Sequence, residues 1–421
     1  MKKLFLLLII PFLSFGQGWE QTYGAEDDDE GFHFQQTNDG GYIIVGRTMS
    51  FGNGGRDVYL IKTDENGNEE WSQAYGGSDD DQGFFVQETM DGGYIIVGQT
   101  MSFENEEGEV YLIKTDENGN EEWSFWNFPD DSNWNSAWNL GRYVQETDDG
   151  GFIVWGTYGV YKIDEAGEEI EWFNIVGGGI EIDKIFEVQK TSDAGFILFG
   201  PCTASETDGC LIKTDSLGNL EWSQSYDGFW DESDVCWSVR QTLNGGYILI
   251  GTEPINSGIH VIKINEIGNI IWSQNYGGLW GMSINLTNDE GYIICGWGFE
   301  GVLIIKIDEN GNEDWTQIYG EPFEDENPTT VGMDVQQSDD GGYIICGVTY
   351  MEELENQTFL IKTDSEGNVT NTSIIEPSTQ TSERKLVRTT NVLGQENITI
   401  KNQSLIEIYD DGSVEKKYLI K

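Results

Sequence analysis

The sequence repeats one unit about every 50 residues, and this repetition constrains the fold more than any other feature. The segment GGYIIVG, or a close variant, returns seven times, with its second glycine at Gly41, Gly93, Gly151, Gly195, Gly246, Gly291 and Gly342. A tryptophan in segments like EEWSQ and a lysine in segments like LIKTD also return once per copy. One such unit cannot bury its apolar face alone, so neighbouring copies must pack on one another.

Each copy contains four short apolar runs separated by glycine-bearing turns, the pattern of antiparallel strands. In order along the copy they read YIIVG, VYLIKTD, NEEWSQAYGG and FFVQETMDGG. Asn-Gly pairs between the second and third runs, as at Asn66-Gly67, Asn118-Gly119 and Asn310-Gly311, predict two-residue hairpin turns. Seven copies of four antiparallel strands predict an all-β fold, a β-propeller with seven four-stranded blades over residues 17–368.

Both ends of the repeat region carry incomplete blades. The N-terminal end supplies third- and fourth-strand material, Trp19 to Tyr23 and Phe32 to Thr37, and the last copy supplies first and second strands near Tyr343 and Leu360. Pairing these pieces would complete the seventh sheet and remove two exposed edges. We therefore expect the two ends to close the ring.

The charge of the chain excludes several partners. Asp and Glu number 75 against 22 Lys and Arg, so the formal net charge is −53. Nucleic acids and anionic membrane surfaces are bound through Lys and Arg, and an acidic surface repels both. We expect an acidic, monomeric protein with no nucleic-acid partner.

The first residues are typical of a secretory signal. Lys2 and Lys3 precede a short apolar run, Leu4 to Phe12, and small residues follow before a cleavage site that we place ahead of Gln17. This run is shorter than the roughly 20 residues of a membrane-spanning helix, and no later segment is apolar enough, so no transmembrane segment is expected. We predict that residues 1–16 are a signal peptide and that the protein is secreted or held on the outer cell surface.

Export permits disulfides, but five cysteines cannot all pair within one chain. Cys202 and Cys210 flank a loop and are the candidate disulfide, although spacing does not fix the connectivity. Cys295 and Cys346 stand where other copies have Val or Ile, which favours small buried core residues.

The recurring lysine has a recurring acidic neighbour. An aspartate stands two residues before the glycine marker in six copies, at Asp39, Asp91, Asp149, Asp193, Asp289 and Asp340, and Asn244 is the exception. The pattern suggests a repeated internal ion pair, which adds geometric specificity more than stability. The alternative is a solvated lysine.

A ligand site is expected where the repeats differ. Because strand direction alternates, loops between the first and second strands share a rim with loops between the third and fourth. These loops vary between copies, and variable loops on a constant scaffold are the usual place for binding. Their aromatic faces suit sugar rings or protein side chains. The candidate ligand-binding residues are Phe51, Phe103, Trp126, Trp134, Trp138, Trp230 and Trp280.

The same rim carries acidic runs, AEDDDEG and GSDDDQG, that could bind Ca²⁺ through carboxylate oxygens. The weak candidates are Asp27, Asp28, Asp79 and Asp80, whose spacing matches no dedicated calcium loop. Apart from calcium, no cofactor is expected. The alternative for the whole rim is that its tryptophans pack between blades and its acids are solvated.

Catalysis has little support. Only His33 and His260 occur, in unrelated contexts, which disfavours Ser-His, Cys-His and histidine-rich metal sites. Glycoside hydrolysis needs only two carboxylates about 5 to 9.5 Å apart, and 75 acids do not single out a pair. We expect no catalytic residues, and a polysaccharide-degrading enzyme with a carboxylate pair on the rim is the alternative function.

Two resemblances complete the prediction. The run GGYIIVGQTMSFENEEGEVYLIKTDENGNEEWSQ resembles propeller repeats common in secreted proteins of Bacteroidetes-type bacteria, over residues 17–375. After a polar linker, 369–382, the segment 383–421 with NVLGQE and IEIYDDGSVEKKYLIK resembles the C-terminal sorting domain of the type IX secretion system. It is shorter than a full sorting module, and the alternative is a strand pair that caps the propeller.

The sorting resemblance implies passage across the outer membrane through that secretion machinery, removal of the segment, and release or surface attachment. The fold alone does not identify a ligand. We expect a secreted or surface binding or adhesion module whose ligand is a glycan or a protein on the aromatic, acidic rim. A purely structural surface protein is a further alternative.

Overall fold

The computed structural model describes residues 18–103, 108–126, 140–157, 159–175, 185–201, 209–226, 238–253, 258–278, 280–298, 300–320, 330–351 and 355–369, and three strands near the C-terminus. The predicted signal peptide lies outside these residues. The chain divides into two compact units, Met1–Thr370 and Asn371–Lys421. The second unit is a three-stranded antiparallel sheet of β29 (Leu386–Asn391), β30 (Ser404–Tyr409) and β31 (Val414–Tyr418).

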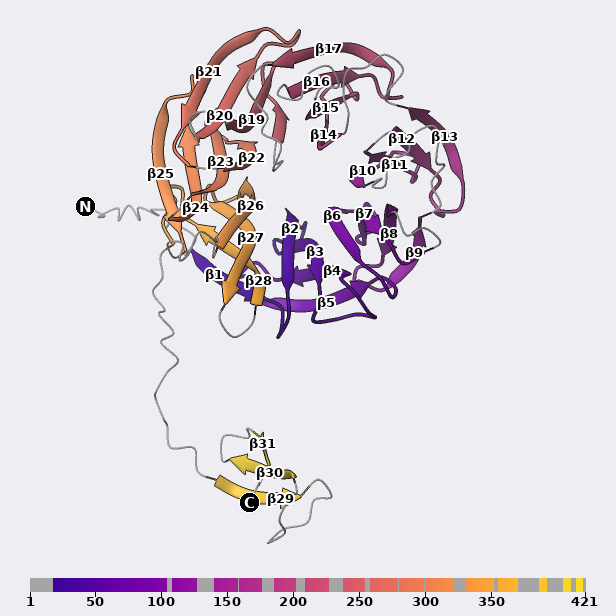
Figure 1. Cartoon of the computed structure of the whole chain (residues 1–421), viewed down its shortest axis with the longest axis vertical. Coiled ribbons are helices and arrows are strands. Elements are labelled where there is room, and N and C mark those ends of the chain that lie inside the picture. The colour runs from indigo at the N-terminus through magenta and orange to yellow at the C-terminus, as the bar shows by residue number, and fades with distance from the viewer. Residues whose placement is uncertain are drawn as a thin grey trace, which may run out of the picture. The chain divides into compact units, whose positions relative to one another are not determined.

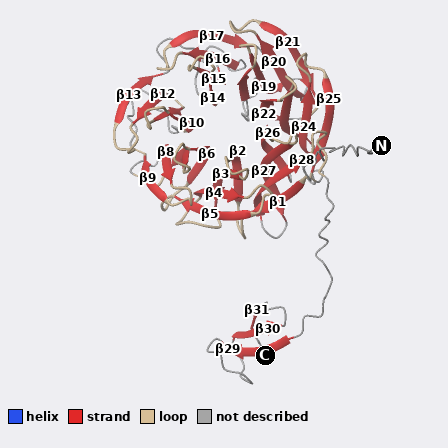
Figure 2. Ribbon diagram, turned by 180° about the vertical axis from the view of Figure 1, so that it is seen from behind, coloured by secondary structure: helices blue, strands red, loops and turns tan. Residues whose placement is uncertain are grey.

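The first unit is a ring of seven antiparallel four-stranded sheets, as predicted, and the described residues contain no helix (Figures 1 and 2). In each blade the first strand lies nearest the centre of the ring and the last lies at its outside (Figure 1). Blade 1 contains β2 (Asp29–Gln36), β3 (Tyr42–Thr48), β4 (Asp57–Thr63) and β5 (Glu69–Tyr75). Blade 2 contains β6 (Asp81–Glu88), β7 (Tyr94–Thr100), β8 (Glu109–Thr115) and β9 (Glu121–Phe125). Blade 3 contains β10 (Gly141–Glu146), β11 (Phe152–Gly156), β12 (Gly159–Ile163) and β13 (Ile170–Ile175).

The remaining blades follow the same order. Blade 4 contains β14 (Glu187–Lys190), β15 (Phe196–Pro201), β16 (Gly209–Thr214) and β17 (Leu220–Tyr226). Blade 5 contains β18 (Ser238–Gln241), β19 (Tyr247–Glu253), β20 (Gly258–Ile264) and β21 (Ile270–Tyr276). Blade 6 contains β22 (Trp280–Leu286), β23 (Tyr292–Gly298), β24 (Gly301–Ile307) and β25 (Glu313–Tyr319). Blade 7 contains β26 (Thr330–Gln337), β27 (Tyr343–Met351), β28 (Glu355–Thr363) and, from the other end of the repeats, β1 (Trp19–Tyr23).

The ring closes as predicted, but with one N-terminal strand rather than two. The strand β1 pairs with β28, from Trp19 opposite Lys362 to Tyr23 opposite Thr358. Phe32 to Thr37, which we expected to complete the last blade, instead forms the inner strand of blade 1. The reason is the short turn that follows: the Thr37 N–H donates to the Gly41 carbonyl at 2.9 Å, so this strand folds back on the next copy of YIIVG.

The Asn-Gly turns are longer than predicted. In the turn at Asp64, the Gly67 N–H donates to the Asp64 carbonyl at 3.1 Å and the Asp64 N–H donates to the Asn68 carbonyl at 2.9 Å. Only Gly67 has a positive φ, of 75°, whereas a two-residue type I′ turn requires positive φ at both central residues. The Asp64 carboxylate accepts hydrogen bonds from the N–H groups of Asn66 and Asn68, which stabilises the longer turn.

The core lies between blades, which explains why YIIVG has no polar face. Ile43 and Val45 of blade 1 pack with Ile96 of blade 2 in one buried cluster, and each fully buried side chain of this size stabilises the fold by roughly 1.5–3 kcal/mol. At the outside of the ring, the Trp71 ring packs on Tyr94 with centroids 5.8 Å apart. The repeated tryptophan therefore packs the outer strand of one blade against the next blade.

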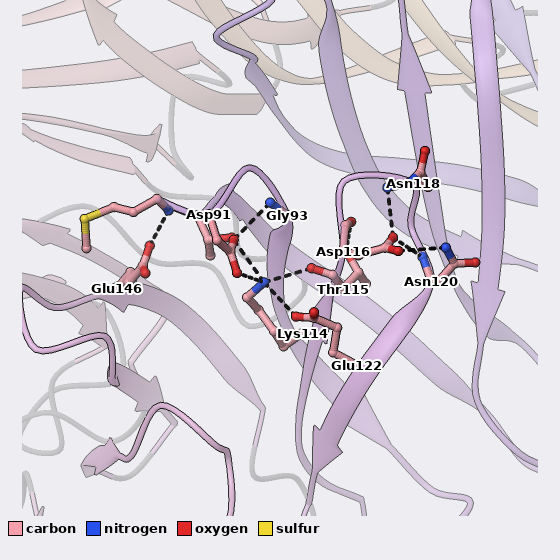
Figure 3. Close-up of polar contacts among 11 residues, drawn as sticks. Asp91, Gly93, Lys114, Thr115, Asp116, Asn118, Asn120, Glu122 and Glu146 are labelled. Atoms are coloured by element: carbon pink, nitrogen blue, oxygen red, sulfur yellow. Dashed lines mark hydrogen bonds and ion pairs between the residues drawn. The ribbon is translucent and has the colours of Figure 1, made fainter.

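In six blades the recurring lysine pairs with the recurring aspartate, as predicted, and in five of these the lysine is buried. In blade 2, Lys114 Nζ lies 2.9 Å from Asp91 Oδ2 and 3.1 Å from Glu122 Oε2, and it donates to the Thr115 carbonyl (Figure 3). The same pairing occurs as Lys62–Asp39, Lys162–Asp149, Lys213–Asp193, Lys306–Asp289 and Lys362–Asp340. Burial acts to raise the pKa of Asp91, but hydrogen bonds from Thr89 and Lys114 outweigh it and hold this pKa at about 2.

The described cysteines agree with their predicted roles where they can be compared. Cys295 and Cys346 are free and buried, as expected for small core residues. Cys210 is disulfide-bonded, but its predicted partner Cys202 lies outside the described residues, so the pairing of these two stays a prediction.

Candidate ligand site

The two sets of variable loops share one rim, as the alternating strand directions predicted. In blade 1, the loop between β3 and β4 meets the loop between β5 and β6: the Arg56 N–H donates to Asp80 Oδ1 at 3.0 Å, and the Asp81 N–H donates to the Arg56 carbonyl at 2.6 Å. We call this side the loop rim. The opposite side carries the short Thr-x-Asp-Gly and Asp-x-x-Gly turns, and we call it the turn rim.

The described rim aromatics do not gather into one surface but pack within their own blades. Phe103 stacks on Trp126 with centroids 4.3 Å apart, and both pack against the core between blades 1 and 2. Trp280 stacks on Trp297 at 5.8 Å in blade 6. Phe51 is 42% exposed and is the one of these candidates that presents a large open face among the described residues. Trp134, Trp138 and Trp230 lie outside the described residues.

The rim acids mostly cap neighbouring backbone. Asp28 Oδ1 accepts a hydrogen bond from the Asn356 N–H at 3.1 Å, as Asp80 does from Arg56 in the next blade. Asp27 and Asp79 each donate their own N–H to a serine hydroxyl, of Ser50 and Ser102. Within the described part of the chain, no group of three or more His, Cys, Asp or Glu is placed to hold a metal ion.

A cavity of about 380 Å³ lies at the centre of the ring, lined by the inner strands of all seven blades. We call it the central cavity. Its wall is built by residues of β2, β6, β10, β18, β22 and β26 and by the start of β14: Phe32, His33, Phe84, Phe85, Arg142, Phe186, Glu187, Val188, Ser238, Arg240, Met282, Ser283, Met333 and Asp334.

In five of the seven inner strands, a β-bulge directs one side chain into the cavity. In β6, the pairing with β7 shifts between Gly83 and Phe85, so Phe84 has no partner in the ladder and lines the cavity instead. The glycine before it is required by close packing, because a methyl group at Gly83 would lie 2.5 Å from a methyl of Val45 in blade 1. The same shift places Phe32, Arg142, Met282 and Met333 in the wall.

One side of the cavity is aromatic and contains the guanidinium group of Arg142. The Arg142 guanidinium lies 5.5 Å from the ring centroid of Phe84 and 5.6 Å from that of Phe186. The rings of Phe32 and Phe84 are stacked with centroids 6.0 Å apart. Rings that flank a guanidinium hold it in place through cation–π attraction, so these residues form a preorganised surface.

The other side is polar, and its charged residues are bonded to neighbouring side chains. Arg240 forms an ion pair with Glu187 and donates from Nε to Asn285 Oδ1 at 2.7 Å. Asp334 Oδ1 accepts a hydrogen bond from the Ser283 hydroxyl at 2.7 Å. Burial raises the pKa of Glu187, and the charge of Arg240 opposes this shift. The wall thus carries two carboxylates and two guanidinium groups in a chain of charge −53.

His33 is the one histidine in the cavity wall. Its ring stacks on Phe85 with centroids 4.3 Å apart, and its Nδ1 faces the Val86 N–H at 3.4 Å. Burial lowers the pKa of His33 to about 4, although the Asp334 charge acts to raise it. The imidazole is therefore neutral at pH 7.

Comparison with one solved propeller supports this architecture. The structure of the Dos1 propeller matches with a TM-score of 0.50 and 9% identity, covering 83% of this chain and 96% of that one. The chain is a seven-bladed β-propeller. The crystal structure of BBS1N in complex with ARL6DN, soaked with mercury, matches with a TM-score of 0.49 and 12% identity, covering 82% of this chain and 95% of that one. No family model matches the sequence, and no curated protein matches it.

The propeller's cavity residues were missed by the sequence prediction, although the repeats contain a signal for them. The inner strands read GFHF, GFFV, GRYV, IFEV, CWSV, GMSI and GMDV. The fourth position is always apolar and is buried in the core, but the second and third positions change from blade to blade and include Arg142, His33 and Glu187. The first position is Gly in five copies, so the greatest change in residue type falls at the second and third positions, most of which line the cavity.

Proposed function

We propose that this propeller is an exported binding module and that its ligand is a protein segment whose apolar side chain enters the central cavity. The observation that carries the proposal is the contrast between constant and variable positions. The Thr, Asp, Gly and Lys positions of the blades keep the scaffold the same, while the second and third inner-strand positions, most of which line the cavity, form a different pair of residues in each blade. Divergence on a constant scaffold is what a specific binding site requires.

The lining supports a protein ligand over a glycan. Phe32, Phe84, Phe186, Met282 and Met333 supply apolar surface, and methionine adapts its shape to different side chains. The charged groups opposite are already bonded, Glu187 to Arg240 and Asp334 to Ser283. A sugar would need several of those groups as hydrogen-bond partners, whereas an apolar side chain would need none. A volume of about 380 Å³ is within the usual range for ligand pockets.

The export route is part of the proposal. The predicted signal peptide, 1–16, and the similarity of 383–421 to a sorting domain support secretion to the outer cell surface through the type IX machinery. The part of the chain that the structure describes includes no helix that is both long and apolar enough to cross a membrane. Deleting residues 383–421 should leave the protein in the periplasm, and surface labelling of the deleted form would contradict this route.

The ligand proposal can be tested by selecting random 12-residue peptides displayed on phage against the full mature chain. We expect enriched peptides to share an aromatic or aliphatic residue. Their affinity should fall at least tenfold in Phe84→Ala, which removes a cavity wall, and should be unchanged in Phe51→Ala, which removes an exposed rim aromatic. Peptides that depend on Phe51 and not on Phe84 would move the site to the loop rim, and a glycan array run in parallel would reveal a sugar ligand.

One observation favours a second candidate, the polysaccharide-degrading enzyme. The cavity brings two carboxyl groups, Glu187 and Asp334, into one wall, and glycoside hydrolysis needs such a pair. Both are already engaged, by Arg240 and by Ser283, which favours structural roles. A reducing-sugar assay decides between the two functions: release of product by the native chain, lost in Glu187→Gln and in Asp334→Asn, would establish the enzyme.

A further inference from the structure

Two carboxylates meet in a buried place where blade 1 contacts blade 2. Asp57 begins β4, Asp81 begins β6, and both residues are fully buried. In each, Oδ2 accepts a hydrogen bond from a loop N–H: Asn53 donates to Asp57, and Gly77 to Asp81, both at 2.8 Å. The second oxygen, Oδ1, has no hydrogen-bond partner among the described residues in either aspartate.

The two side chains converge on Gly76. A methyl group placed on this glycine would lie 2.2 Å from Asp57 Oδ1 and 2.4 Å from Asp81 Oδ2, so these two oxygens are at most 4.6 Å apart. Gly76 has a φ of 156° and no side chain, and any larger residue there would overlap both carboxylates. Two like charges at this distance, removed from water, cost free energy unless a cation compensates them.

The junction between blades 7 and 1 is an internal comparison. There Gln357 occupies the position of Asp57, since it pairs with Thr349 as Asp57 pairs with Thr48, and Asp29 occupies the position of Asp81. Gln357 Nε2 donates to the carbonyls of Ala25 and Asp27, at 3.1 and 3.2 Å. An amide therefore supplies donors to the loop at this junction.

At the junction of blades 1 and 2 the corresponding carbonyls belong to Gly77 and Asp79. The Asp57 side chain has no N–H to donate to them, so it cannot make the hydrogen bonds that the Gln357 amide makes. The Ser102 hydroxyl donates to Asp81 Oδ2 at 2.6 Å, but Oδ1 of each aspartate stays without a donor among the described residues. Carboxylate and backbone carbonyl oxygens together are the ligand set of Ca²⁺, whose six to eight positions tolerate irregular geometry and water. Mg²⁺ demands a regular octahedron and is less suited.

We propose that a Ca²⁺ ion binds between Asp57 and Asp81, with the carbonyls of Gly77 and Asp79 completing the protein ligands, and that it joins the loop rims of blades 1 and 2. The site differs from the predicted one, because it uses the last aspartate of the run GSDDDQG together with Asp57 from another loop.

The test compares native chain with Asp57→Gln, which installs the residue that the other junction carries and so should fold. Both are stripped of metal, then titrated with CaCl₂ while bound calcium is counted by equilibrium dialysis and thermal unfolding is followed. We expect the native chain to bind one more tight Ca²⁺ than Asp57→Gln and to gain several degrees of melting temperature that the variant does not gain. MgCl₂ at the same concentration should produce less than half of this gain.

A matched control separates this site from weak binding to the acidic surface. Glu65→Gln removes one carboxylate from an exposed turn and should keep the full calcium response. The proposal is overturned if Asp57→Gln and the native chain bind the same number of ions, or if calcium raises both melting temperatures equally. It is also overturned if calcium changes neither the number of ions bound by the native chain nor its melting temperature.

Discussion

Blade 5 differs from the other six blades at the buried lysine. Six blades hold their lysine with an aspartate from the first hairpin, and most add a second acid from the outer strand. Blade 5 has Asn244 and Ile271 at these two positions. Its lysine, Lys263, donates to the Glu309 carbonyl of blade 6 at 2.9 Å and lies 5.4 Å from the centroid of the Tyr292 ring. A buried lysine can thus be satisfied without any carboxylate.

The same blade exposes apolar side chains where others expose polar ones. Ile267 and Ile270, on the turn rim of blade 5, are 65% and 57% exposed, and the equivalent residues of blade 1 are Asn66 and Glu69. The neighbouring blade 4 shows the same change at Leu217 and Leu220. Blade 5 forms its four strands with apolar residues at these turn positions. The blade fold therefore does not require polar or acidic residues there.

The largest expected effect is on acid stability. The aspartates of the ion pairs, such as Asp39 and Asp149, have pKa values of about 2, below the ordinary value of 3.8. Because a lowered pKa in the folded state stabilises it only while the group is ionised, stability should be complete above pH 4 and fall as the pH drops from 4 to 2. Hydrogen exchange followed blade by blade should show the hairpins of six blades losing protection in this window.

Blade 5 is the built-in control for that experiment, since Asn244 does not titrate. Its first hairpin should lose protection only with global unfolding. Equal pH dependence in all seven hairpins would mean that the ion pairs do not set the acid limit of the fold.

The next effect comes from removing the lysine itself. Lys114→Met keeps the apolar stem but leaves the Asp91 carboxylate and the Thr115 carbonyl without the ammonium that they share. Charge-assisted hydrogen bonds are worth roughly 1.5–3 kcal/mol, so we expect a loss of about 2 kcal/mol in the free energy of unfolding. Lys263→Met loses one bond to a carbonyl and should cost about 1 kcal/mol. Urea denaturation of the two variants measures the difference, and an equal cost would show that the carboxylates contribute nothing.

A smaller gain should follow from giving blade 5 the residues of the other blades. The double variant N244D/I271E places two carboxylates around Lys263, and we expect the free energy of unfolding to rise by up to about 1 kcal/mol at low salt, as is usual for pairs with one exposed partner. The gain should disappear in high salt because the ions screen it. Ser216→Glu, which adds a charge to an exposed turn, is the control and should give no gain.

Much of the fold could be predicted because its signals recur seven times. The repeat spacing, the four strands, the closing strand at Trp19 and the Lys–Asp pairs, with the exception at Asn244, were all legible in the sequence and are confirmed. Signals that are purely local were less reliable. Asn66-Gly67 suits turns of two lengths, and the choice depends on the Asp64 side chain, which bonds to the backbone on the far side of the turn.

The candidate site was harder to predict because it exists only after the ring closes. Residues such as Phe84, Arg142 and Phe186 stand about 50 residues apart and share no motif, so nothing local marks them as neighbours. The rim aromatics were predicted as ligand-binding residues because of their residue type, but the rings of Phe103 and Trp126 stack on each other. The variable second and third positions of the inner strands were the usable signal, and reading them required the knowledge that these strands face the centre.

The smallest expected effect concerns the exposed apolar residues of blade 5. Substitutions I267N/I270E restore the residues of blade 1 at exposed positions, so the free energy of unfolding should change by less than about 0.5 kcal/mol. Retention on a hydrophobic-interaction column at high salt, where the repulsion of a chain of charge −53 is screened, should fall clearly because the apolar patch is gone. The reverse variant N66I/E69I should give blade 1 the same retention that blade 5 loses. If neither variant changes retention, these side chains do not form a patch that a partner or a column can recognise, and the difference between the blades is confined to the buried lysine.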